Sequence, residues 1–367
     1  MYKRIVIKIG TSLLADKVRG INLDRVQKIA AAVAALCAGG KEVCLVTSGA
    51  IGAGVAALKL KERPVSIPEK QATAAIGQPL LMEAYEHAFR KQNILIGQLL
   101  LTKDDFVDRQ RYLNAKNTFA VLLKKGVVPI INENDTVAVE EIKVGDNDNI
   151  SAMVANLIEA DILLILSNIK GLCKGDPSQD TSAELVPVVE KITPEIEKLV
   201  RSSKGELATG GMATKIQAAK KCAAAGITMV IADGTEPAII NEIIAGEPRG
   251  TLFVPCDRKL TQRQLWIAYI AHAKGRLCLD AGALEALLKK GKSLLPSGIK
   301  AVSGKFNAGD VVILTDKDGS EIAKGVVEYS SLDAEKIKGK KSSELIRTVG
   351  FKGRNELVHR DNLVILK

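Results

Sequence analysis

The stretches RIVIKIG at 4–10, LDRVQKIAAAVAALCAGG at 23–40 and EVCLVTSGA at 42–50 together decide the fold. A short β-branched run that ends in glycine predicts a strand, and the Ala-rich segment closed by Gly39-Gly40 predicts a helix. Further apolar runs of strand length follow at 93–101, 126–132, 160–168 and 227–234. Continuous apolar strands that alternate with helices predict an α/β fold with a parallel sheet covered on both faces.

Polar loops follow the predicted strands. GTS follows the first strand, TSGAIGAG the second, and NENDT and SNIKG follow later ones. Sheets of this class bind ligands at the carboxyl ends of their strands. We therefore expect the functional site at this edge.

The chain has 367 residues, which is more than one core usually holds. After GTLFVP at 250–255 the pattern changes to short strands separated by Asp-Gly and Ala-Gly-Asp turns, which indicate hairpins. We predict a catalytic domain at 1–256, a helical linker at 257–275 and a small mixed β domain at 276–367.

Composition excludes several classes of protein. With 47% hydrophobic and 26% charged residues the chain is typical of a globular protein, and no apolar run approaches the roughly 18 residues of a membrane span. The N-terminus enters a strand directly, so we expect no signal peptide and a cytoplasmic location. The six cysteines are scattered without a CxxC pair, so neither a disulfide framework nor a zinc site is expected.

Lys8 is unusual because it lies inside an apolar strand and precedes Gly10-Thr11-Ser12. A buried ammonium group needs a partner. One interpretation is that Lys8 contacts a phosphate, with the Gly-Thr-Ser backbone donating to the phosphate oxygens. The other is an edge-strand lysine whose ammonium reaches water. The residues leave both open.

Two glycine-rich loops precede predicted helices. TSGAIGAG at 47–54 lacks the Rossmann GxGxxG spacing, and TGGMATK at 209–215 is not a Walker A loop. Amides at a helix N-terminus bind anions, and a bound phosphate would offset the unfavourable place of Lys215 near a helix start. Tight packing around the first loop and a surface lysine in the second are equally good explanations.

Acids and amides are concentrated in INENDTVAVEEIKVGDNDN at 131–149. The site candidates in this segment are Asn132, Asp135, Asp146, Asn147 and Asp148. Such side chains can bind an ammonium group, and Asp146 or Asp148 could order Mg²⁺ or orient a lysine. Turn formation explains Gly145-Asp146-Asn147 but not both clusters. The three histidines lie outside every loop considered, so histidine chemistry is not expected.

The motifs VIKIGTS, VTSGAIGAG, INENDTV, EIKVGDNDNISA and ATGGMATK together resemble the amino-acid kinase family. GKSLLPSGIKAVSGKFNAGDVV and VHRDNLVI resemble parts of a PUA domain. The resemblance covers nearly the whole chain. It implies an α/β/α sandwich with a mainly parallel central sheet, followed by a small PUA-like domain of mixed β structure.

The resemblance also implies a reaction: phosphorylation of the γ-carboxylate of L-glutamate by ATP with Mg²⁺, giving L-glutamyl 5-phosphate, the first step toward proline. Lys8 and Lys215 would neutralise the charge on the phosphoryl group during its transfer, and Asp148 would position the two lysines. Glutamate would be bound by Ser48, Asp135 and Asn147. The ATP contacts implied are Lys8, Ser167, Asn168, Thr209, Gly210, Gly211, Met212, Ala213, Thr214 and Lys215. No side chain is expected to ligate a metal.

One residue departs from the family pattern, and several partners are implied. Ser167-Asn168 stands where the family usually has Thr-Asp or Ser-Asp, which puts one nucleotide contact in doubt. Proline as feedback inhibitor, a homo-oligomer (dimer or tetramer) and a glutamyl-phosphate reductase partner are implied by resemblance alone. Two alternatives stay open. One is a sister kinase acting on aspartate, acetylglutamate or a nucleotide monophosphate. The other is RNA binding by the basic tail, where 276–367 hold 17 Lys and Arg against 12 Asp and Glu.

Overall fold

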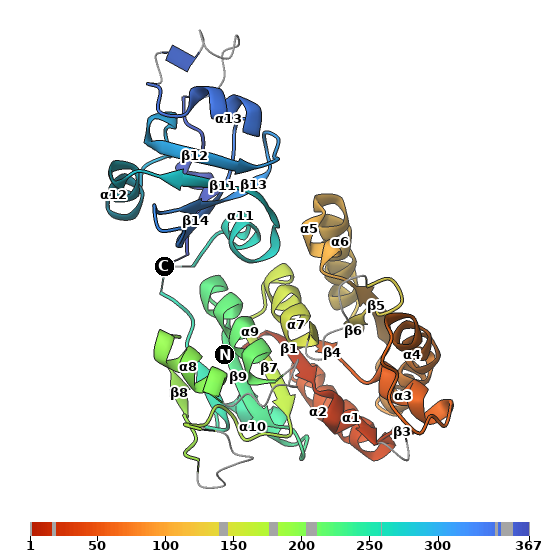
Figure 1. Cartoon of the computed structure of the whole chain (residues 1–367). Coiled ribbons are helices and arrows are strands. Elements are labelled where there is room, and N and C mark those ends of the chain that lie inside the picture. The colour runs from red at the N-terminus through yellow and green to blue at the C-terminus, as the bar shows by residue number, and fades with distance from the viewer. Residues whose placement is uncertain are drawn as a thin grey trace. The chain divides into compact units, whose positions relative to one another are not determined.

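The computed structural model describes residues 2–16, 20–138, 146–175, 183–202, 211–257, 259–341, 344–345 and 355–366. The chain divides into two compact units, Met1–Lys259 and Leu260–Lys367. Figure 1 colours the first from red to green and the second from cyan to blue. Within the described residues, no helix is both long and apolar enough to cross a membrane.

The first unit is built on a sheet of eight described strands, ordered β5-β6-β4-β1-β7-β9-β10-β8. Neighbouring strands are parallel, except that β10 runs antiparallel to β9. The fold prediction is therefore confirmed, with β1 in the middle of the sheet. The strands are β1 (Arg4–Ile9), β4 (Glu42–Val46), β5 (Ile96–Leu101), β6 (Val128–Glu133), β7 (Ile162–Ser167), β8 (Val188–Val189), β9 (Thr228–Asp233) and β10 (Thr251–Phe253), with a separate pair β2 (Ala15–Asp16) and β3 (Gly20–Ile21).

Helices cover both faces of this sheet (Figure 1). One core joins α2, α4 and α10 to the side chains of Ile5, Ile7 and Ile9 on β1. Because side chains alternate along a strand, Lys8 faces the opposite layer, where α7 contacts β1 and α9. The helices are α1 (Thr11–Leu14), α2 (Leu23–Ala38), α3 (Ala50–Ala57), α4 (Ile67–Arg90), α5 (Asp104–Val107), α6 (Arg109–Lys124), α7 (Asp146–Leu157), α8 (Pro194–Ser202), α9 (Met212–Ala225) and α10 (Ile239–Ala245).

Glycines of the 47–54 loop let α3 pack very closely against α4. Gly49 has φ +107° where α3 begins, a backbone conformation that favours glycine. A Cβ on Gly54 would lie 2.0 Å from the backbone oxygen of Thr73, and one on Gly77 would lie 1.8 Å from that of Ala50. Close packing therefore accounts for Gly54, and α4 is held directly beside the loop that carries Ser48.

Gly77→Ala is expected to destabilise the first unit. The added methyl group would overlap the Ala50 carbonyl, so α3 and α4 would have to separate. We expect a loss of about 3 kcal/mol and a fall in Tm of about 6–12 °C, measured by thermal unfolding. The control is Gly282→Ala in α12 (Ala281–Lys290), where the nearest atom to a new Cβ lies 3.5 Å away. An unchanged Tm for Gly77→Ala would contradict the packing argument.

The second unit contains a five-stranded sheet ordered β12-β11-β13-β14-β15 among the described residues. β11 is parallel to β13, and the other pairs are antiparallel. Part of the predicted linker is helical and packs in this unit, since Ile267 and Ala268 share a core with Val311 and Val326. The elements are α11 (Gln262–Leu265), η1 (Trp266–Ile270), β11 (Ala273–Leu279), α12, η2 (Pro296–Gly298), β12 (Ile299–Gly304), β13 (Val311–Thr315), β14 (Glu321–Val326), α13 (Ser331–Ile337), η4 (Arg360–Asn362) and β15 (Leu363–Ile365).

Candidate active site

A buried cluster of two lysines and one aspartate lies at the carboxyl edge of the sheet. Lys8 is one residue from the end of β1, Asp148 is in the first turn of α7, and Lys215 is in the first turn of α9. The Asp148 Oδ1 atom lies 2.7 Å from Lys8 Nζ, and its Oδ2 atom lies 3.2 Å from Lys215 Nζ. Thr214 Oγ1 also donates to Oδ2, at 2.7 Å. Asp148 therefore holds both ammonium groups in place.

The two interpretations of Lys8 that the sequence leaves open are separated by burial. Its side chain is 6% exposed and that of Lys215 is 7% exposed. β1 is also a central strand. Neither lysine is therefore a surface residue whose ammonium lies in water. The Gly10 N–H donates to Leu166 O at 2.9 Å, so the sheet uses one of the backbone donors that the phosphate interpretation would need.

The cluster carries one positive charge more than its carboxylate neutralises. Burial would raise the pKa of Asp148, but the ammonium groups of Lys8 and Lys215 hold it below its usual value. Burial lowers the pKa of Lys8 despite the attraction of Asp148. The N-terminal ends of α7 and α9 add their positive dipole ends at the same place. This arrangement favours the binding of an anion, which would relieve the excess positive charge.

A chain of amide hydrogen bonds lies beside the cluster, on the side of β4 and β6. Asn147 Nδ2 donates to Ser48 Oγ at 3.1 Å and to Asn132 Oδ1 at 3.0 Å. Asn132 Nδ2 donates to Gln78 Oε1 at 2.8 Å. Within the described residues, Gln78 Nε2 and Asn147 Oδ1 are buried and have no hydrogen-bond partner. The chain thus ends in a free donor and includes a free acceptor.

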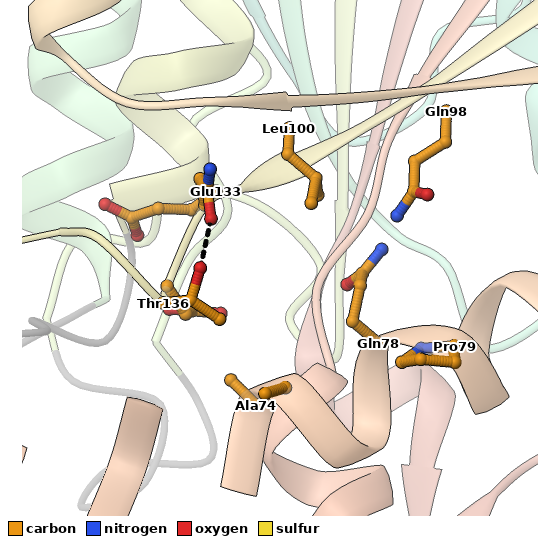
Figure 2. A pocket seen from close by; sticks show the side chains of 10 residues that line it. Ala74, Gln78, Pro79, Gln98, Leu100, Glu133 and Thr136 are labelled. Carbon is orange, nitrogen blue, oxygen red and sulfur yellow. Dashed lines mark hydrogen bonds between the residues drawn. The ribbon is translucent and has the colours of Figure 1, made fainter. Parts of the chain in front are cut away.

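A pocket of about 330 Å³ opens where this chain ends (Figure 2). Its walls come from α4, from β5, and from the end of β6 with the turn that follows. The lining residues are Ala74, Ala75, Gln78, Pro79, Gln98, Leu100, Glu133, Asn134, Asp135 and Thr136. Burial raises the pKa of Asp135 to about 6. The carboxylate of Asp135 would therefore gain from a cationic ligand in the pocket.

The remaining predicted contacts lie on the other side of Lys8. Ser167 ends β7, its hydroxyl donates to Asn168 Oδ1 at 3.4 Å, and it pairs in register with Asp233 of β9. Gly211 precedes α9 with φ +144°, and Met212 and Ala213 form the first turn of that helix with Thr214 and Lys215. Thr209 and Gly210 lie outside the described residues, and the side chain of Asp146 is not described either.

The order of the strands gives the site two sides. The predicted substrate contacts follow β4 and β6. The predicted nucleotide contacts follow β7 and lie at the start of α9, and Lys8 lies between the two sets on β1. Gln78 was missed by the sequence analysis, because glutamines in the long helical segment 67–90 match no motif. The only signal was a polar residue next to Pro79, within an otherwise Ala-rich and Leu-rich stretch.

Comparisons with known proteins agree with this architecture. The family model described as "Amino acid kinase family" matches residues 3–233, and the PUA domain model matches residues 275–349. Glutamate 5-kinase of Thermoanaerobacter sp. (strain X514) is 50% identical over 364 residues, covering 99% of this chain and 98% of that protein. Glutamate 5-kinase of Moorella thermoacetica is 48% identical, covering 99% and 96%.

A solved structure shows the same fold at low sequence identity. It is carbamate kinase from Giardia lamblia bound to AMP-PNP, with a TM-score of 0.50 and 18% identity. The match covers 69% of this chain and 98% of that one, and at this identity it bears on the fold alone.

Proposed function

The chain belongs to the amino acid kinase family, and within it to the glutamate 5-kinases, and we propose that it transfers the γ-phosphoryl group of ATP to the 5-carboxylate of L-glutamate. The observation that carries this proposal is the buried Lys8–Asp148–Lys215 cluster beside a pocket with an unpaired amide donor and a destabilised carboxylate. The cluster suits a phosphoryl group, and the pocket suits a small zwitterion.

In this reaction the protein has to align the reactants and stabilise negative charge, and no general base is needed. A carboxylate acceptor is already ionised at neutral pH, so no proton has to be removed before it attacks. Phosphoryl transfer depends on alignment and on stabilisation of the charge on the phosphoryl oxygens. Lys8 and Lys215 would donate to those oxygens from opposite sides of Asp148. Asp148 is a positioning residue, because its carboxylate touches the lysines rather than the reactants.

Mg²⁺ would come to the site with ATP rather than be held by a protein cluster. No group of three or more His, Cys, Asp and Glu suited to a metal occurs among the described residues. Asp148 Oδ1 forms an ion pair with Lys8, and Oδ2 accepts from Lys215 and Thr214. When bound to the phosphates, Mg²⁺ neutralises part of their charge.

Proline inhibition, oligomer formation and a reductase partner stay predictions from resemblance.

The proposed reaction is tested by an acceptor panel. Purified protein with Mg²⁺-ATP is given glutamate, aspartate, N-acetylglutamate or UMP, and ADP release is measured while hydroxylamine traps any acyl phosphate. We expect hydroxamate and ADP in equal amounts with glutamate alone. Turnover with one of the other acceptors and none with glutamate would assign the chain to a sister kinase.

Asp135→Asn is expected to raise the KM for glutamate by roughly 10–100-fold with a smaller change in kcat, since a charged hydrogen bond to the ammonium group is lost. In the wild type the KM should rise as pH falls from 7 to 5, because the Asp135 carboxyl group, with a pKa of about 6, becomes protonated and cannot hold a cation. The variant should lose most of this pH dependence.

Asp135→Asn should weaken the binding of glutamate without lowering the stability of the folded protein. A carboxyl group whose pKa is raised in the folded state lowers stability as pH rises from about 4 to 6. At pH 7 Asp135→Asn should therefore be at least as stable as the wild type by thermal unfolding. A raised KM together with a strongly lowered Tm would indicate a structural role instead.

A further inference from the structure

Among the residues that the structure describes, the pocket lining offers no cation for the second carboxylate of an amino acid. Its ten lining residues include Glu133 and Asp135 and no Lys, Arg or His. Of the described lining residues, only neutral ones can donate to a substrate carboxylate bound there. Thr136 Oγ1 donates to Asn134 Oδ1 at 2.6 Å, so the hydroxyl is already engaged. The amides of the lining are the remaining side-chain donors.

Gln78 is the amide whose orientation the structure fixes. Its Oε1 accepts from Asn132 Nδ2, and Asn132 in turn accepts from Asn147. Each amide in this chain gives its NH₂ group to the next oxygen, so the NH₂ group of Gln78 is the donor left over at the pocket end of the chain. That Nε2 atom is buried and, within the described residues, has no partner. A buried donor without an acceptor is costly, and a carboxylate would satisfy it.

Gln98 faces Gln78 from the other wall. Gln78 lies on α4 and Gln98 on β5, and Figure 2 shows their side-chain amides pointing toward one another across the pocket. The Gln98 side chain belongs to an exposed residue, so it can rotate at little cost, whereas Gln78 is held by Asn132. Two amides from opposite walls can each donate to one oxygen of a carboxylate.

We propose that Gln78, assisted by Gln98, binds the α-carboxylate of the acceptor amino acid and so makes the site selective for α-amino acids. The inference rests on the proposed function, which supplies a substrate with two carboxylates. Asp135 and the free Asn147 Oδ1 would take the ammonium group, and the second carboxylate would face Lys8. The recognition adds no charge to the pocket, so the excess positive charge stays with the lysine cluster.

The test compares three acceptors in Gln78→Glu. This substitution keeps an oxygen for Asn132 Nδ2 and replaces only the donor that faces the pocket. Glutamate carries both groups, 4-aminobutyrate lacks the α-carboxylate, and glutarate lacks the ammonium group. Inhibition constants against glutamate turnover are measured for the two analogues, so they need only bind. We expect the substitution to weaken the binding of glutamate and glutarate on the order of 100-fold, and the binding of 4-aminobutyrate by less than threefold.

Gln71→Glu is the matched control, because Gln71 lies on the same helix and donates to Ala138 O outside the pocket. It should leave all three values near those of the wild type. Equal weakening of all three ligands by Gln78→Glu would overturn the proposal, as would no weakening at all. Should Gln78→Glu fail to fold, Gln78→Met gives the same ratio test, since loss of the Asn132 contact affects every acceptor alike. Absence of wild-type turnover with glutamate would instead reject the proposed function.

Discussion

Lys215→Ala is expected to lower kcat by about 100–1000-fold and to change the KM for glutamate by less than threefold. Its ammonium group is one of the two that Asp148 fixes, and the proposed glutamate contacts lie on the other side of Lys8. Loss of an aligned donor to the phosphoryl oxygens should therefore appear in the chemical step. Steady-state kinetics with the hydroxylamine trap measures both constants.

Stability separates this effect from simple damage to the fold. Without Lys215 the cluster keeps the Lys8–Asp148 pair and loses its excess positive charge, so Tm should stay within about 3 °C of the wild type. Lys220→Ala is the control. Lys220 lies on the same helix, but it forms an ion pair with Glu197 of α8, with 2.7 Å between Nζ and Oε1, and not with Asp148. A kcat for Lys215→Ala within threefold of the wild type would remove Lys215 from the phosphoryl site.

The fold could be predicted from the sequence because its signals are local. Most of the parallel strands are apolar runs, and several helices have N-terminal caps of their own, such as Asn22 before α2 and Ser66 before α4. What could not be predicted is how segments far apart in the chain pair with each other. That β1 is central, and that Lys8 is therefore buried, depends on the strand order, which no local pattern contains.

In the candidate site, too, some features follow from local sequence and others depend on contacts between distant segments. Motifs and the family resemblance pointed to Lys8, Asp148 and Lys215, and the packing of α7 against α9 places one carboxylate between the two ammonium groups. Gln78 lies 54 residues before Asn132 in sequence, and its role depends on a hydrogen bond between them. The glycines of the 47–54 loop were ambiguous because two explanations, close packing and anion binding, fit the same local sequence. Gly54 is needed for contact between α3 and α4, but a glycine-rich loop before a helix also suits anion binding.

Asp148→Asn is expected to have the largest effect of any single substitution in the site. It removes the anion that two buried ammonium groups share, and loss of one partner from a buried ion pair costs about 3–5 kcal/mol. We expect a matching fall in the free energy of unfolding measured with denaturant. Because both lysines would also lose their fixed positions, kcat should fall by about 1000-fold or more. Asp24→Asn, which breaks an exposed pair with Lys28, should change stability by less than about 0.5 kcal/mol.

The pH dependence of the Asp148→Asn variant identifies the cause. Burial already lowers the pKa of Lys8, and without Asp148 the repulsion from Lys215 is no longer offset, so the pKa should fall further. A lysine whose pKa is lower in the folded state binds fewer protons there than in the unfolded chain, so stability rises with pH between its folded and unfolded pKa values. The stability deficit of Asp148→Asn relative to the wild type should therefore shrink between pH 7 and pH 9.5. A deficit that is constant over this range would mean that lost packing, rather than an unpaired buried charge, destabilises the variant.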